Sequence, residues 1–165
     1  MRHYLVRVAS EADRQLYHAI RRAVLWEERG RQGYDDARPE ERLSNNHRLL
    51  LTFDGQGIGT TRLDDLRDGT GLVRLVAVTG AVRGQGHGRI LNAMVENYAR
   101  GLGIGTLFVN AAPNAEGFYA ATGWMRCRNN APEQLGHTER GVQMIKTIIR
   151  RDPESVSLPP AAQPA

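Results

Sequence analysis

The sequence predicts an α/β fold: a mixed β-sheet of about six to seven strands flanked by helices, with a glycine loop between one strand and one helix. Short apolar runs rich in β-branched residues alternate along the chain with segments of helical periodicity. In the first half, the turn residues 54–57 separate two such runs and favour an antiparallel hairpin. In the second half, the runs 72–78 and 106–111 flank a helical segment, which predicts that these two strands are parallel.

Local signals place the individual elements. Residues 2–9 alternate imperfectly between apolar and polar side chains, which is typical of a strand. Ser10 and, three residues later, Asp13 form a helix-start pattern, so a first helix should run to about residue 26. By similar reasoning we expect helices at 39–43, about 90–102 and 113–122, and strands at 48–53, 58–63, 72–78, 106–111, 124–127 and 141–149, the last two as a candidate pair.

Composition suits one soluble domain with a core of its own: the chain has 165 residues, of which 41% are hydrophobic and 24% charged. We expect the domain to cover residues 1–150 and the tail at 151–165 to be disordered. No apolar run approaches the length of a membrane span, and the first residues lack a secretory signal pattern. Cys127 is the only cysteine, which excludes an internal disulfide and a cysteine-rich zinc site. These features predict a cytoplasmic protein.

Positive charge in this chain comes almost entirely from arginine. The net charge is +4 with the histidines neutral, and Lys146 is the only lysine. An arginine-rich chain can bind nucleic acid, but these arginines are scattered and no nucleic-acid motif accompanies them. Nucleic-acid binding is therefore a minor alternative.

The clearest functional signal is the segment 72–89, LVRLVAVTGAVRGQGHGR. An apolar run ends in a short turn, Arg83 follows, and three glycines then alternate at Gly84, Gly86 and Gly88 before a helix begins. Such a loop leaves several backbone N–H groups pointing at one spot, and the positive end of the helix dipole adds to them. We therefore predict an anion site suited to a phosphate or pyrophosphate.

Other types of glycine loop fit this segment less well. A Walker loop needs a lysine followed by serine or threonine after its last glycine, and neither is present. A dinucleotide-binding loop needs glycine at its sixth position, which is Arg89 counted from Gly84 and Leu91 counted from Gly86. A surface turn without a ligand is the remaining alternative, but the strand before the loop and the helix after it favour phosphate binding.

Two blocks of sequence point to a known family. The first is Arg83-x-x-Gly86-x-Gly88 between a strand and a helix. The second follows one helix and one strand later and contains Asn114, Phe118, Tyr119, Gly123 and Trp124. In order and spacing these blocks resemble the signature of the GNAT family of N-acetyltransferases. The resemblance directly covers residues 72–125, and the order of elements elsewhere agrees with it.

The resemblance implies that acetyl-CoA, as acyl-donor substrate, gives its acetyl group directly to an amine of a small molecule or peptide, without a metal. It implies that the strand before the loop splays from its parallel neighbour and pairs with the pantetheine arm, while the Val78 N–H polarises the thioester carbonyl. Tyr119 would protonate the leaving thiolate, and Arg83 would either contact a phosphate or brace the loop. The implied cofactor-binding residues are Val76, Ala77, Val78, Arg83, Gly84, Gln85, Gly86, His87, Gly88, Arg89, Asn114 and Tyr119.

The general base stays open, because the strand before the loop carries Arg74 where many family members have a glutamate. Glu27 or Glu28, at the end of the first helix, is the first candidate; the others are Asp64, Asp65, His137 and a chain of water molecules. If Glu27 or Glu28 serves, Trp26 and Tyr34 would lie in the acceptor wall and offer apolar or cation-binding surface.

Two other functions remain at this point. Because the strand before the loop lacks a glutamate, the protein could also be a non-catalytic sensor of the same fold that binds acetyl-CoA or CoA. The arginine content motivates a nucleic-acid-binding module whose loop holds a backbone phosphate. The expected partners are acetyl-CoA and an amine acceptor, with no membrane, and a homodimer through the terminal strands is left open.

Overall fold

The computed structural model describes residues 2–149, which form one seven-stranded mixed sheet in the order β1-β2-β3-β4-β5-β7-β6. This confirms the predicted α/β class. The tail expected to be disordered, 151–165, lies outside the described residues. The strands are β1 (His3–Arg7), β2 (Asn46–Phe53), β3 (Gln56–Asp65), β4 (Thr70–Val78), β5 (Thr106–Ala111), β6 (Met125–Arg126) and β7 (Val142–Thr147).

Three strand pairings were predicted, and the structure contains all three. β2 and β3 form the expected antiparallel hairpin, and β1 and β4 pair antiparallel on its two sides. β5 is parallel to β4, because helix α2 (His87–Gly101) carries the chain back across the sheet between them. The two last strands, β6 and β7, also pair as expected, and β7 joins them to β5.

The first helix, α1 (Glu11–Arg21), begins where the sequence predicts. The Ser10 hydroxyl accepts a hydrogen bond from the Asp13 N–H at 3.0 Å, which satisfies one free amide of the first turn. The helix does not continue evenly to Trp26: it widens into a π-turn at Arg22–Trp26 and tightens into a 3₁₀ turn at Glu27–Arg29. Gly30, with φ of 66°, ends it.

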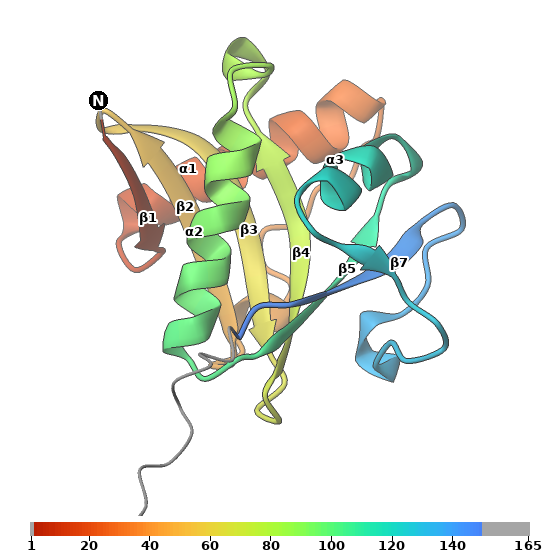
Figure 1. The fold of residues 1–165 in the computed structure, drawn as a ribbon. Coiled ribbons are helices and arrows are strands. Elements are labelled where there is room, and N and C mark those ends of the chain that lie inside the picture. The colour runs from red at the N-terminus through yellow and green to blue at the C-terminus, as the bar shows by residue number, and fades with distance from the viewer. Residues whose placement is uncertain (1, 150–165) are drawn as a thin grey trace, which may run out of the picture.

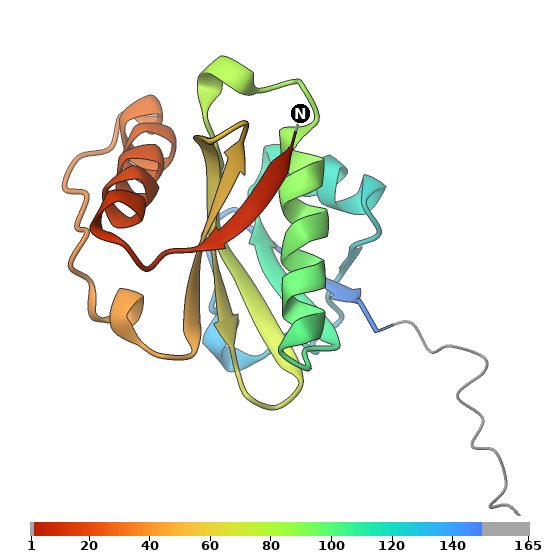
Figure 2. The same ribbon diagram turned by 90° about the vertical axis from the view of Figure 1, so that its left-hand side faces the viewer.

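Helices cover both faces of the sheet. Figures 1 and 2 show α1 on one face, and α2 with α3 (Glu116–Ala121) on the other. Apolar residues of the inner strands point alternately to the two faces, so each face has a core of its own. The α2 core includes Leu49, Leu51, Leu63, Val73, Leu91 and Leu107, and the α1 core includes Tyr17, Ile20, Leu25, Trp26, Leu50 and Ala77.

The parallel strands β4 and β5 separate along their length. They pair only from Thr70 with Thr106 to Val73 with Val109, although β4 continues to Val78. The last residues of β4 therefore have β3 on one side and, among residues 2–149, no strand on the other. This is the splaying that the family resemblance implied.

A β-bulge interrupts β4 just beyond the point of separation. Thr60 of β3 pairs with Ala77, but Arg62 pairs with Arg74, so β4 holds one extra residue. Within the bulge, Leu75 has φ of 56°, a left-handed conformation that bulky residues rarely adopt. The sequence carries no glycine here, and sequence analysis did not predict this feature.

Candidate active site

The glycine loop connects β4 to α2 and presents a row of unpaired amides. Gly84 and Gly86 have φ of 76° and 85°, and Gly86 is the residue that precedes the helix. The first amide of α2 with a backbone acceptor is that of Ile90, 3.3 Å from the Gly86 carbonyl. Within residues 2–149, the six backbone N–H groups of 84–89 have no hydrogen-bond acceptor. This is the geometry of an anion cradle at a helix N-terminus.

His87 contributes its backbone to this loop while its side chain is turned inward. The ring is buried, and its Nδ1 lies 2.9 Å from Nε2 of His3 on β1. The Phe53 ring packs against both imidazoles. Burial, and next the neighbouring His87, lower the pKa of His3. The pair thereby ties the start of α2 to the edge of the sheet.

Arg83 braces the loop in this structure. Its Nε donates to the Val78 carbonyl at 3.0 Å, and its guanidinium pairs with Glu28 at 2.6 Å. Glu28 therefore lies at the glycine loop, although its own turn is far away in sequence. Glu27 is exposed, and its carboxylate has no partner among residues 2–149. Of the two adjacent glutamates that the sequence left as equal candidates, only Glu28 contacts the glycine loop in the described part of the chain.

The end of β4 turns polar backbone groups toward the gap left by β5. The Thr79 N–H bonds to Ile58 of β3 at 2.9 Å, so Thr79 faces β3. Because backbone groups of successive strand residues point to alternate sides, the Val78 N–H faces the gap. The same alternation turns Val76 to the gap and Ala77 to β3. The Ala77 side chain packs in the α1 core, on the opposite face from the α2 core.

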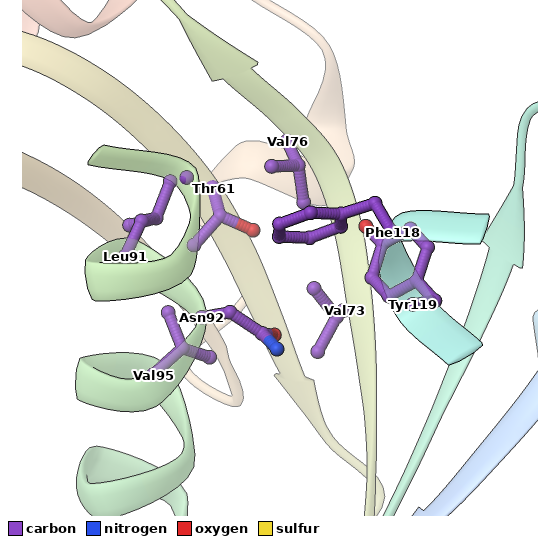
Figure 3. Close-up of a pocket in the computed structure, with 9 residues that line it drawn as sticks. Thr61, Val73, Val76, Leu91, Asn92, Val95, Phe118 and Tyr119 are labelled. Atoms are coloured by element: carbon purple, nitrogen blue, oxygen red, sulfur yellow. The ribbon is translucent and has the colours of Figure 1, made fainter. Parts of the chain in front are cut away.

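A small cavity of about 30 Å³ lies beside this gap, between β4, α2 and α3. Figure 3 shows Leu91, Asn92 and Val95 of α2 on one side of it, and Phe118 and Tyr119 of α3 on the other. Thr61 of β3 and Val73 and Val76 of β4 complete the wall. The site is therefore assembled from four elements that are distant in sequence.

Tyr119 is almost fully buried, with 6% of its surface exposed, and it packs edge-on against Phe118 and Trp124. Burial raises the pKa of its phenol to about 12. The hydroxyl is therefore protonated at neutral pH and can serve as a proton donor. Asn114 lies in the 3₁₀ turn Pro113–Ala115 just before α3; it is exposed, and its side chain makes no hydrogen bond within residues 2–149.

The other candidate bases are occupied or exposed. Asp64 binds Arg62 through both carboxylate oxygens, at 2.7 and 3.0 Å, and also binds Arg74 at 2.9 Å. Asp65 accepts the Arg67 N–H at 2.8 Å, in a turn at the far end of β3. His137 is exposed in the loop before β7. Asp64 in particular is held by two arginines.

Arg74 also holds a segment from the other end of the chain. Its guanidinium donates to the carbonyls of Gln134 and Leu135 in the 3₁₀ turn η6 (Glu133–Leu135). Asn110 of β5 donates to the Leu135 carbonyl at 2.9 Å. The loop before β7 is thus fastened over the fork between β4 and β5, on the face opposite to α2.

A chain of buried charges runs beneath α1. Arg21 of α1 contacts Glu41 at 2.5 Å, and Glu41 contacts Arg62 of β3 at 3.3 Å. Through Asp64 this series of charges continues to Arg74 on β4, whose side chain is partly exposed. Burial acts to raise the pKa of Glu41, but the charge and hydrogen bond of Arg21 and the charge of Arg62 outweigh it and lower that pKa. Sequence analysis missed this network, because its members come from α1, η3 (Pro39–Arg42), β3 and β4.

Trp26 and Tyr34, expected to offer a surface for cations, already contact arginines of this chain. The Arg31 guanidinium lies 4.8 Å from the Trp26 ring centre, and the Arg22 guanidinium lies 5.1 Å from that of Tyr34. The two rings also pack edge-on against each other. A cation of an acceptor would have to compete with these arginines for the two rings.

Two further features concern what the described residues lack. Within residues 2–149, no group of three or more His, Cys, Asp or Glu side chains is arranged to hold a metal ion. None of the helices in this part of the chain combines the length and apolar character that crossing a membrane needs.

The fold and the site define a class: a mixed-sheet protein with a glycine loop of unpaired amides beside an open strand edge. Residues 24–148 match the family model of the acetyltransferase (GNAT) domain. The chain therefore belongs to the GNAT acetyltransferase family, as the two sequence blocks indicated.

Solved structures support this assignment. A predicted N-acetyltransferase from Lactobacillus plantarum is 26% identical, with a TM-score of 0.73 over 89% of this chain and 99% of that chain. An acyl-CoA N-acyltransferase from Pseudomonas aeruginosa is 19% identical, with a TM-score of 0.71 over 88% of this chain and 99% of that chain. The N-acetylglutamate synthase of Neisseria gonorrhoeae, complexed with CoA and N-acetyl-glutamate, is 21% identical, with a TM-score of 0.71 over 91% of this chain and 36% of that chain. The last two likenesses show the fold.

Proposed function

We propose that this protein is an acetyl-CoA-dependent N-acetyltransferase that acetylates an amine of a small molecule or peptide. The observation that carries the proposal is the row of unpaired amides at 84–89, directly beside an open edge of β4. The first feature suits a pyrophosphate, and the second suits the amide-bearing arm of CoA. The synthase of N. gonorrhoeae, which has the same fold, was crystallised with CoA.

The loop and β4 would divide the work of binding. The N–H groups of 84–89 would receive the pyrophosphate, where a Cβ on Gly86 would obstruct the approach of the phosphate to the backbone. Val76 and Val78 would pair with the pantetheine arm through the backbone groups that face the gap. Arg83 would brace the loop through Val78 and Glu28, as it does in this structure.

Acyl transfer requires three events at the thioester. The amine nitrogen forms a bond to the carbonyl carbon, the carbon–sulfur bond breaks, and the amine loses a proton. The Val78 N–H would stabilise the oxyanion that develops on the carbonyl oxygen, an effect worth about 3 kcal/mol at comparable acyl-transfer sites. Tyr119 would give its phenolic proton to the leaving thiolate and regain one from solvent.

The proton of the amine would leave through Glu28 or water. Glu28 is placed ahead of Glu27 because it lies at the glycine loop, where its one ion pair within residues 2–149, with Arg83, is exposed on both sides and can open to free the carboxylate. Asp64, which is bound to two arginines, is set aside. We also propose a cytoplasmic location, a single domain over residues 1–150 and no requirement for a metal.

The experiment that tests this function measures binding and turnover separately. Acetyl-CoA at about 100 times its Kd should stabilise the fold by about 2.7 kcal/mol and raise Tm, because a ligand that binds only the native state stabilises it by mass action. Turnover is then measured as CoA release against a panel of amines. No Tm shift with either acetyl-CoA or CoA would refute the proposal. Binding without turnover on any amine would favour the non-catalytic sensor. The pairing of Asp64 with two arginines is consistent with that alternative, because it leaves one candidate base fewer.

A further inference from the structure

We propose that Thr61 is a positioning residue for acyl transfer: its hydroxyl holds the bulge of β4 and so directs the Val78 N–H into the gap. The inference rests on the proposed function, because it concerns the donor that would stabilise the oxyanion. Thr61 itself lies on β3 and precedes the glycine loop by more than 20 residues, outside both sequence blocks of the family.

Thr61 occupies the point where β3 meets the bulge. It is fully buried and lines the cavity together with Val76 and Phe118 (Figure 3). Its Oγ1 donates to the Arg74 carbonyl at 2.9 Å. This carbonyl belongs to the residue just before Leu75, whose φ of 56° marks the bulge. The hydroxyl therefore fastens the peptide group that enters the strained residue.

The bulge decides which backbone groups face the gap. In a regular strand the direction of the N–H and C=O groups alternates from residue to residue, and one inserted residue reverses that alternation for all that follow. Without the extra residue, Val76 and Val78 would face β3, and Ala77 would face the gap. The position of the Val78 N–H is thus a consequence of the bulge at Leu75.

A left-handed leucine persists only where its surroundings hold it. The Leu75 side chain packs against the α1 core, on one side of the sheet. The Thr61 hydroxyl acts from the other side, where the cavity lies. Loss of this hydrogen bond would let the bulge relax or slide along β4, and the Val78 N–H would move with it.

The chain offers a matched control in the adjacent residue. Thr60 is as deeply buried as Thr61, with 0% of each exposed, but the Thr60 hydroxyl has no partner within residues 2–149. Thr60→Val and Thr61→Val make the same exchange of a hydroxyl for a methyl group. Only the second removes the hydrogen bond to the bulge. Thr61→Ser retains the hydroxyl and tests for rescue.

The experiment compares the three variants in Tm, Kd for CoA, kcat and KM. Thr61→Val should lower kcat about tenfold to a hundredfold, because displacement of a reacting group by about 1 Å costs a factor of up to this order. Its Kd for CoA should change much less, since the amides of 84–89 are untouched. Thr61→Ser should restore most of kcat, and Thr60→Val should leave kcat unchanged.

An NMR measurement keeps the inference open to refutation even if the protein binds acetyl-CoA without turnover. The Val78 amide resonance should shift on acetyl-CoA binding in the wild type and in Thr60→Val, and it should shift less in Thr61→Val. If kcat and the Val78 amide shift of Thr61→Val equal those of the wild type, or if both variants lose kcat equally, the positioning role is refuted while the proposed function stands. If the wild type binds no acetyl-CoA, the proposed function is what fails, and this role falls with it.

Discussion

At the scale of single residues, Tyr119 combines a packing role with a chemical one. Its ring belongs to the α2 core, and its phenol belongs to the cavity beside β4. The burial that packs the ring also raises the pKa of the phenol to about 12, so the proton donor is intact through neutral and moderately alkaline pH. One physical cause, removal from water, therefore serves both roles.

Tyr119→Phe should lower kcat about a hundredfold and leave the Kd for CoA nearly unchanged, because a general acid contributes about this much and the ring itself remains. Steady-state kinetics and calorimetric titration measure the two quantities. Tyr98→Phe is the control: its hydroxyl lies 2.6 Å from His47, and Tyr98 does not line the cavity. An equal loss of kcat in both variants would return Tyr119 to a purely structural role.

Gly86→Ala should abolish CoA binding, because the added Cβ would lie where the backbone must approach the phosphate. The substitution also strains the backbone, so a matched variant is needed. Gly69 has the same φ of 85° and equally open surroundings, but it lies in the turn before β4, at the other end of the strand. Gly69→Ala should lose similar stability in urea and still bind CoA. If Gly86→Ala binds CoA normally, the loop is not the phosphate site.

At the scale of elements, β4 organises the molecule. One edge pairs with β3 on both sides of the bulge, and the other pairs with β5 only as far as Val73. Its side chains reach the cavity on the α2 face and the buried charges on the α1 face, where Arg74 meets Asp64. The strand was predictable from its β-branched run. Its bulge was not, because the left-handed Leu75 is imposed by neighbours and not by a local sequence signal.

Glu41→Gln should destabilise the protein by about 3 kcal/mol, because it leaves Arg21 and Arg62 buried beside a neutral amide. Urea unfolding measures the loss. Glu40→Gln, an exposed neighbour whose side chain contacts no charge within residues 2–149, should change stability by less than about 0.5 kcal/mol. A similar small effect at both positions would mean that the buried pair contributes little.

The same network sets the direction of a pH dependence. The folded pKa of Glu41 lies below its ordinary value of 4.5, so the native state holds the carboxylate ionised where the unfolded chain would bind a proton. The stabilisation is therefore complete above that value and is lost as pH falls through the folded pKa. In Glu41→Gln this part of the acid loss should be absent, which unfolding curves at a series of acidic pH values would show.

At the scale of the whole molecule, the buried charges link layers that the apolar cores keep apart. The series of ion pairs from Arg21 to Arg74 connects α1 to the middle of the sheet, and Arg74 also donates a hydrogen bond to the loop before β7. We therefore expect thermal unfolding to be one cooperative transition, with near-UV and far-UV circular dichroism changing together. Two separate transitions would contradict the proposal of a single domain over residues 1–150.

The sequence by itself determined the class of fold, three of the strand pairings, the glycine loop and the family. These follow from short-range patterns: apolar periodicity, a serine cap, alternating glycines and two blocks of family signature. Only the tertiary structure decided what the side chains meet. It paired His87 with His3, 84 residues away, it placed Glu28 on Arg83, 55 residues away, and it bound Asp64 to two arginines. Such contacts depend on which strands are adjacent and which faces are covered, and no local pattern in the chain encodes that.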